Sequence, residues 1–293
     1  MTTQQRLLKK IETYLAAARV PRYVQRRGMK RYTTAELVLG LAVREAYRLS
    51  YRRAAAFLDE YYHLQLHWTT LQKAAARFPA WFWHCVLQAT ASTTSMLAAI
   101  DATGFARSAP SEHYLHRIDG VRPAVPVKLS ILVDVESRKV LSARVRVKPA
   151  GDVRDVHGLV QRATEPPLVI VMDKGYDSEP LHEWLDERGV RSIAPPRKGC
   201  RHGRHRTNLR DHFPNDEYGQ RNIVEAVFRR LKALFGSHVR GRSARTVRAE
   251  IFMRLILQNI IFWLKRYFLQ TRGMGSEYIP SGAKLRFSTR IRE

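Results

Sequence analysis

The first third of the chain has the hydrophobic spacing of short helices. Apolar residues recur every three or four positions in segments that follow Thr34, Ser50 and Thr69, and the last of these segments stops before Pro79. Serine and threonine are preferred at helix starts because their hydroxyl groups accept hydrogen bonds from the unpaired N–H groups of the first turn. Residues 1–95 are therefore predicted to form a small all-helical domain.

The helices that follow Ser50 and Thr69 are predicted to form a helix-turn-helix that binds DNA. In that motif the second helix enters the major groove, and here its polar residues are Thr70, Gln72, Lys73 and Arg77. The connection over residues 61–68 is longer than is usual for the motif. A plain helical packing module is the alternative, because three-helix units are common and their polar residues are generic.

From Leu97 onwards the pattern changes to short runs of β-branched residues bounded by turns, which predicts strands. The expected strands cover residues 97–103, 127–133, 140–147, 168–172 and 191–194, with helices over 153–162 and 179–188. Three strands that pair in sequence, followed by alternating helix and strand, predict a mixed five-stranded sheet with flanking helices. The chain is thus predicted to be an α/β protein, with the mixed sheet and its helices in a domain over residues 96–270.

The segment over residues 218–232 is predicted to be an amphipathic helix with one polar line. At about 100° per residue, four reactive side chains fall within roughly 60° of each other. These are Tyr218, Arg221, Glu225 and Lys232, and they are flanked by Asn222 and Arg229. A carboxylate among cations suits a metal-bound phosphate. The alternative is ordinary Glu-to-Arg pairing on a solvated helix face.

Two aspartates upstream occupy strand positions. Asp101 interrupts a short apolar run, and Asp173 ends the β-branched run over residues 168–172, just before a glycine-containing turn. Asp134 is an alternative to the first and Asp177 an alternative to the second, although either could instead have a structural role. Three carboxylates brought together from distant positions repel one another unless cations lie between them, so such a cluster would imply metal ions.

The spacing Tyr-x2-Arg-x3-Glu-x6-Lys, with two aspartates upstream in order, resembles the signature of the DDE transposases of bacterial and archaeal insertion sequences. The resemblance runs from about Thr34 to the helix near Leu264. It implies an RNase-H-like catalytic domain in which Asp101, Asp173 and Glu225 are the catalytic and metal-binding residues. It also implies hydrolytic cleavage at element ends, followed by strand transfer into target DNA.

In this resemblance the cofactor would be two Mg2+ ions, for which Mn2+ can substitute. Asp101 would bridge both ions, and Asp173 and Glu225 would each hold one. The remaining polar residues of the helix would position DNA phosphates, the arginines by bidentate hydrogen bonds and the lysine as a point charge. These residues are Tyr218, Arg221, Arg229 and Lys232. The expected partners are double-stranded DNA, both terminal inverted repeats and target, and a second copy of the chain as a homodimer in the synaptic complex.

The formal net charge of +25 agrees with a polyanionic partner. A ribosome-associated or membrane-surface basic protein would share that charge. The two cysteines, Cys85 and Cys200, exclude a disulfide framework and suit a reducing cytoplasm. The N-terminus has no apolar signal core, and polar residues interrupt the apolar segment over residues 249–269 at Glu250, Arg254, Gln258 and Lys265. We therefore expect a cytoplasmic, nucleoid-associated protein without a membrane span, and a buried amphipathic helix over that segment.

Two basic segments lack periodicity. Residues 197–216 are predicted to be a mobile loop that grips DNA, and residues 271–293 a poorly ordered basic tail. The first segment contains Cys200, His202, His205 and His212, but without the paired spacing typical of zinc sites.

Two other functions compete with the transposase. A transposase-derived repressor or architectural protein that no longer cuts DNA would be expected to have lost one of the three acids. A two-metal repair nuclease would keep the acids but would not need the Tyr-Arg-Glu-Lys line. Terminal inverted repeats close outside the coding frame would favour the transposase.

Overall fold

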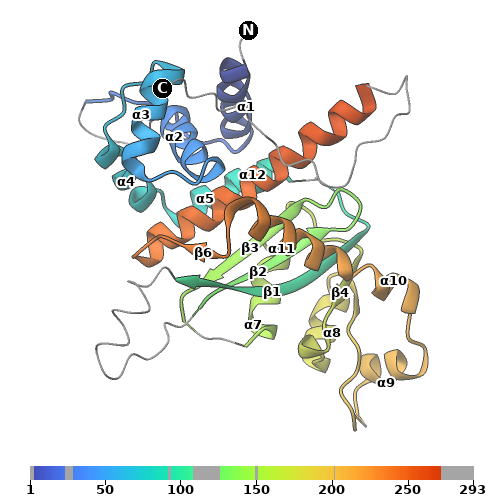
Figure 1. Cartoon of the computed structure of the whole chain (residues 1–293). Helices are drawn as coiled ribbons and strands as arrows, with labels where there is room; N and C mark the ends of the chain where they lie inside the picture. Colours follow the sequence, from blue (N-terminus) through green and yellow to red (C-terminus); the bar gives the residue numbers. More distant parts are fainter. Residues whose placement is uncertain are drawn as a thin grey trace, which may run out of the picture.

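The structure is a computed structural model that describes residues 3–23, 29–91, 94–107, 126–148, 151–200 and 202–271, without the side chains of residues 3–7 and 262–271. A helical N-terminal region lies against a mixed β-sheet that has helices on both faces (Figure 1). This arrangement confirms the predicted α/β class. The predicted tail over residues 271–293 lies almost entirely outside the described residues.

Five helices form the described N-terminal region. They are α1 (Thr3–Ala17), α2 (Thr34–Ala46), α3 (Tyr51–Tyr62), α4 (Trp68–Arg77) and α5 (Ala80–Thr90). Ser50 caps α3 as predicted, but the cap of α2 is Thr33. Thr33 and Glu36 form a reciprocal capping box, which leaves the hydroxyl of Thr34 to donate to the Pro21 carbonyl at 2.7 Å.

Helices α3 and α4 are the predicted helix-turn-helix pair, and α4 begins two residues earlier than predicted, with His67 rather than Thr69 as its cap. Leu71 and Ala75 are buried against the other helices. Gln72, Lys73 and Arg77 are exposed on the opposite side of α4. Their contact with DNA stays a prediction.

The sheet contains all five predicted strands. Its strands are β1 (Leu97–Arg107), β2 (Val127–Asp134), β3 (Val140–Arg146), β4 (Val169–Met172), β5 (Arg191–Ile193) and β6 (His238–Val239). The order is β3-β2-β1-β4-β5, with β2 antiparallel to both neighbours and β4 parallel to β1 and β5. The two-residue strand β6 pairs with the end of β1 and was not predicted, because two residues are too short to show alternation.

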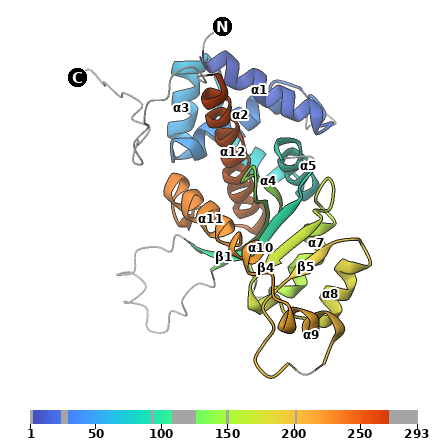
Figure 2. The same ribbon diagram turned by 90° about the vertical axis from the view of Figure 1, so that its right-hand side faces the viewer.

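Alternation along β1 assigns its side chains to two different cores. Ala98 and Ile100 pack with α7 (Val153–Val160) and α8 (Glu179–Asp186). Ala99 and Phe105 belong to the core on the other face, which includes α5, α11 (Asn222–Phe235) and α12 (Ala244–Thr271) (Figure 2). Asp101 and Thr103 have the same parity as this second pair, and they therefore face α11.

Helix α12 packs against α2, α4 and α5 as well as the sheet, so the N-terminal helices and one sheet face share a continuous apolar core. The division into domains at residues 95 and 96 stays a prediction. In the described part of the chain, no helix combines the length and apolar character needed to cross a bilayer. The polar residues Glu250, Arg254 and Gln258 of α12 are buried. Arg254 forms ion pairs with Glu250 and with Glu45 of α2, which offset the cost of burying these three charges.

The prediction of an irregular loop over residues 197–216 is wrong over residues 204–211 and from residue 215 onwards, where helices form. This segment contains α9 (Arg204–Asp211) and the beginning of α10 (Asn215–Gly219). Glu179 accepts hydrogen bonds from the first N–H groups of α9, those of His205 and Arg206. The Arg206 guanidinium donates two hydrogen bonds of 2.8 Å to the buried Asp177. These charged contacts with Glu179 of α8 and with Asp177, just before α8, therefore hold α9 in place. Helix α9 has almost no apolar face of its own.

Candidate active site

Two of the predicted site residues lie side by side in the sheet. Asp101 is in the middle of β1, and Asp173 directly follows β4. The parallel register pairs Ile100 of β1 with Met172 of β4. The residues that follow them along the two segments are Asp101 and Asp173. Neighbouring strands are about 4.8 Å apart. The sheet therefore brings these two carboxylates together, although 72 positions separate them in sequence (173 − 101).

Helix α11 brings the third carboxylate to the same place. The Arg221 guanidinium lies 3.4 Å from the Asp101 carboxylate through Nη1, and its Nη2 donates to the carboxylate of Glu225. Arg221 thus lies between an acid of the sheet and an acid of the helix. Glu225 and Asp173 are exposed, and Asp101 is partly buried. Solvent can therefore reach the cluster from the side of the two exposed carboxylates.

The surroundings of Asp101 disfavour its negative charge. Burial raises the pKa of the Asp101 carboxyl above its usual value, and the nearby Asp173 and Glu225 carboxylates raise it further. The Ala102 N–H, which donates to the Asp101 carboxylate at 2.7 Å, and the Arg221 guanidinium lower the pKa but do not outweigh burial. A carboxylate in this position gains from any additional cation placed beside it.

Lys232 fixes the later part of α11 to β1. Its ammonium donates to the Thr103 hydroxyl at 2.8 Å and lies 5.6 Å from the centre of the Phe105 ring. Sequence analysis did not single out Thr103. Strand alternation from Asp101 would have placed it on the same face of β1. Lys232 therefore meets the sheet two residues beyond Asp101.

The predicted single helix over residues 218–232 is interrupted. Tyr218 belongs to α10, which ends at Gly219, and α11 starts at Asn222 after a turn at Gln220 and Arg221. Glycine disfavours helix, and the Ile223 and Val224 N–H groups bond to the third residue before them. The Tyr218 ring packs edge-on against Phe213 at 5.1 Å, and Arg229 is exposed on α11.

The donor chemistry of the cluster fits a hard divalent cation, because carboxylate oxygens are the ligands that Mg2+ prefers. Among the residues that the structure describes, however, no three His, Cys, Asp or Glu side chains are arranged closely enough to hold a metal ion. Arg221 is bonded to two of the three acids. Metal binding would therefore require Asp101 and Glu225 to exchange this guanidinium for the ion.

The two alternative acids have structural partners. Asp134 accepts hydrogen bonds from the Ser95 hydroxyl at 2.7 Å and from the Ser137 N–H at 2.8 Å, which closes the turn after β2. For Asp177, burial would raise the pKa of the carboxyl, but hydrogen bonds from Arg206 and from the Arg197 N–H lower it overall. Both acids are committed to holding local structure.

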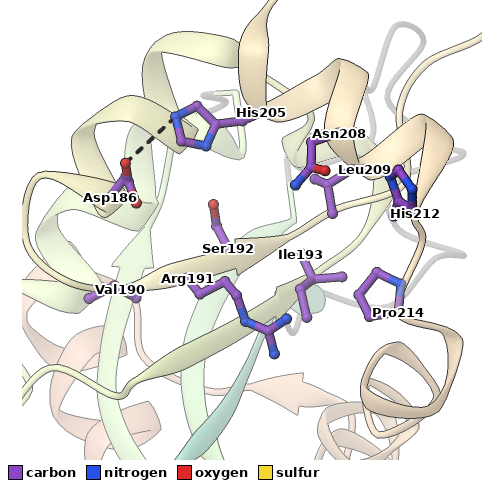
Figure 3. Close-up of a pocket in the computed structure, with 10 residues that line it drawn as sticks. All are labelled: Asp186, Val190, Arg191, Ser192, Ile193, His205, Asn208, Leu209, His212 and Pro214. Carbon is purple, nitrogen blue, oxygen red and sulfur yellow. Dashed lines mark ion pairs between the residues drawn. The ribbon is translucent and has the colours of Figure 1, made fainter.

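A separate pocket lies between α8, β5 and α9 (Figure 3). Its volume is about 120 Å3, and its lining includes Asp186, Ser192 and His205 but none of the predicted site residues. His205 lies 3.9 Å from the Asp186 carboxylate. The helix that occupies the predicted loop therefore builds one wall of this pocket rather than contributing to the carboxylate cluster.

A sequence-family model described as "Transposase DDE domain" matches residues 93–260, which is more than half of the chain. Among solved structures, a piggyBac transposase synaptic complex with hairpin DNA has a TM-score of 0.52 and 10% sequence identity, covering 93% of this chain and 75% of that chain. The catalytic core domain of BIV integrase has a TM-score of 0.30 and 12% identity, covering 60% of this chain and 99% of that chain. The first likeness, together with the strand order, confirms the predicted RNase-H-like fold. The second is too weak to carry an argument.

Proposed function

Because the chain belongs to the transposase DDE domain family, we propose that it cuts DNA at the ends of an insertion sequence and joins those ends to target DNA. Asp101, Asp173 and Glu225 are the proposed catalytic carboxylates. The observation that supports this is their convergence, since Asp173 follows the neighbour strand of Asp101 and Arg221 links Asp101 to Glu225. Structural acids of this chain, such as Asp134, are instead satisfied by local hydrogen bonds.

The family works with divalent metal ions, and we propose two Mg2+ ions at this cluster, with Mn2+ as a substitute. When bound, such ions lower the pKa of an attacking water or hydroxyl and stabilise the leaving oxygen at phosphorus. Asp101 has the central place in this proposal, because burial disfavours its unneutralised charge and both other carboxylates raise its pKa. Without an ion, the Arg221 guanidinium holds Asp101 and Glu225 near each other.

The partner we propose is double-stranded DNA, as terminal repeat and as target. Arg221 can turn its planar guanidinium from the carboxylates to a phosphate, which it would hold by two parallel hydrogen bonds. Lys232 of α11 adds a point charge, and Tyr218 and Arg229 are proposed as further phosphate contacts. The piggyBac structure is described as a synaptic complex, and by analogy we propose a homodimer that pairs two ends. Its place of action would be the nucleoid.

The test is a cleavage assay on a supercoiled plasmid that carries the DNA flanking the coding frame, with Mg2+ and the full-length chain. Wild type should give nicks, excised ends and joined products. Glu225→Gln keeps the size of the side chain but removes a charge, so cleavage should fall on the order of a thousandfold while DNA affinity stays equal or rises. Glu187→Gln, an exposed acid at the end of α8, is the matched control and should cut normally.

Each alternative function has its own outcome in this assay. Wild-type cleavage by Glu225→Gln would discard the catalytic assignment. Nicks without joined products from the wild type would favour a repair nuclease. Binding without any cleavage by the wild type would favour a silent repressor or architectural protein.

A further inference from the structure

A second charged site lies at the free edge of the sheet. The β3-edge groove is an open cavity of about 350 Å3 beside β3, the terminal strand of the sheet, and it also involves α5, α12 and the segment after α7. Five cations and one histidine line it, namely Arg144, Arg146, Lys148, Arg162, Arg248 and His84. The rest of the lining is apolar, and among the described lining residues none is acidic.

The nearest carboxylate matches only part of this charge. Asp155 of α7 is fully buried, and it accepts hydrogen bonds from Arg146 Nε at 2.6 Å and from the Ser130 hydroxyl at 2.8 Å. Arg144 Nε lies 3.1 Å from the same carboxylate. Within the described part of the chain, Lys148, Arg162 and Arg248 form no ion pair with a carboxylate. The groove therefore presents excess positive charge to solvent.

The pKa values of two groups in the groove are lowered by burial and by the neighbouring positive charges. Burial and the neighbouring Arg144 lower the pKa of the Arg162 guanidinium. Burial, followed by Arg162, Arg248 and Arg144, lowers the pKa of His84 to about 4. His84 is therefore neutral at pH 7, and its ring packs edge-on against Phe252 at 4.8 Å. A concave surface with an apolar wall and a single sign of charge concentrates its field on an incoming anion.

The layout of the charges favours a polymeric anion. Arg144 and Arg146 occupy alternate positions on β3, and Lys148 continues the series just beyond the strand. At about 3.3 Å per residue this row is roughly 13 Å long, which exceeds a single phosphate group. Arg162 and Arg248 lie beside the row, from the segment after α7 and from α12. Successive phosphates of one DNA strand would meet successive cations along it.

The groove is separated from the carboxylate cluster. Strand β2 lies between β3 and β1, and α11 and α5 lie on opposite sides of α12 (Figure 2). We propose that the β3-edge groove binds the phosphodiester backbone of a DNA segment other than the one at the carboxylates. This inference rests on the proposed function, which supplies DNA as the partner. Backbone contacts of this kind position DNA without reading its sequence.

The test uses the full chain and a 40-base-pair duplex (about four helical turns) of arbitrary sequence, because a backbone site needs no specific ends. The double variant Lys148→Ala/Arg248→Ala removes two cations that form no ion pair in the described chain. Its affinity at low salt should fall roughly tenfold. The slope of log affinity against log salt should become shallower by about 0.9 for each lost phosphate contact. The matched control is Lys9→Ala/Arg188→Ala, which removes a lysine and an arginine outside the groove.

Equal losses in both double variants would overturn the inference, because the effect would then be one of overall charge. The single reversal Lys148→Glu, at an exposed position, replaces the double variant if the latter melts at a lower temperature. Inorganic pyrophosphate is the small-anion probe. If the groove variant loses pyrophosphate binding but keeps the wild-type salt slope for DNA, the occupant is a small phosphate compound and the inference is wrong.

The plasmid assay separates this inference from the proposed function. If wild type cuts DNA and the groove variant binds DNA as wild type does, only the groove inference fails. If wild type never cuts DNA but the groove variant loses salt-dependent affinity, the proposed function fails and the groove remains a DNA site.

Discussion

The carboxylate cluster and the β3-edge groove both contain arginine, but they differ in how its positive charge is matched by carboxylates. At the cluster, Arg221 lies between Asp101 and Glu225, with Asp173 nearby. In the groove, Asp155 pairs with two of the five cations, Arg144 and Arg146, and no other described carboxylate pairs with the groove cations. Acids near DNA weaken binding through repulsion of phosphates. Their concentration at one place therefore suits chemistry there, whereas the unmatched cations of the groove suit binding alone.

The two regions also contain titratable groups that burial shifts towards their neutral forms. Burial raises the pKa of the Asp101 carboxyl and lowers the pKa of the His84 imidazole. A cation placed beside Asp101 would favour its charged form. An anion placed beside His84 would do the same for the imidazolium. The pKa of each group should therefore change when the partner proposed for its region binds.

The largest expected effect separates cutting from binding. Asp173→Asn should reduce cleavage on the order of a thousandfold, because it removes one of three proposed metal-binding charges. Affinity for the duplex should change by no more than about twofold, since the substitution removes no cation. Plasmid cleavage and fluorescence anisotropy measure the two effects. The groove variant Lys148→Ala/Arg248→Ala should instead lose more duplex affinity than cleavage. A parallel loss of cleavage and of duplex affinity in Asp173→Asn would contradict the division of roles.

A smaller effect concerns the arginine of the cluster. Arg221→Ala should slow cleavage by about tenfold to a hundredfold, the range for residues that orient metal ligands. Arg221 lowers the pKa of Asp101. Its removal should therefore raise that pKa further and move the acid limb of the pH–rate profile to higher pH. Single-turnover cleavage measured across pH tests this shift, and Arg221→Lys should restore part of it. An unmoved acid limb would show that Arg221 does not act through Asp101.

The histidine of the groove predicts a pH effect on stability. Because the pKa of folded His84 is lowered to about 4, the unfolded chain takes up this proton first as pH falls below about 6.5. The contribution to stability is complete above that value and is lost as pH falls towards the folded pKa. The groups facing His84 are Arg144 of β3, Arg162 after α7 and Arg248 of α12. Urea unfolding at several pH values should show the loss, and His84→Gln should reduce it.

Duplex DNA provides a second readout of the same histidine. Phosphates in the groove would offset the neighbouring cations, so they should raise the pKa of the His84 imidazole. Imidazole NMR titrations with and without the duplex measure this change. If the His84 titration is the same without DNA and at a saturating concentration of the duplex, the DNA binds elsewhere.

The smallest expected effect comes from moving charges without removing them. A Cβ atom at Gly158 would lie 2.6 Å from Arg162 Nη1 and 2.7 Å from Arg144 Nη1, so both guanidiniums must shift in Gly158→Ala. Both atoms are the ends of flexible side chains, and alanine is favoured over glycine in a helix by up to about 1 kcal/mol. Stability should therefore stay equal or rise slightly. DNA affinity should fall only about twofold to threefold, well below the effect of losing two contacts. Thermal unfolding and anisotropy measure the pair of effects, and a gain in affinity would show that these guanidiniums do not line the binding path.

Strands and the acids within them could be predicted because their signals are local. Asp173 ends a β-branched run, and β4 ends at Met172. The parallel register of β1 and β4, which only the structure gives, then places Asp173 beside Asp101. The pairing of Asp101 with Arg221 spans 120 positions. It required the fold, because helical periodicity gives the face of α11 but not the strand that it covers.

The sequence by itself determined the helical N-terminal region, the five main strands, the apolar side of α11 and the order of the three acids. Each of these features depends on the spacing of residues that are close together in sequence. Only the tertiary structure decided that α9 is a helix, that Arg254 is buried between Glu45 and Glu250, and that five cations gather at β3. These features depend on ion pairs and packing between residues far apart in sequence. Arg206 meets Asp177 across 29 positions and Arg254 meets Glu45 across 209, and local hydrophobic patterns contain no information about such distant partners.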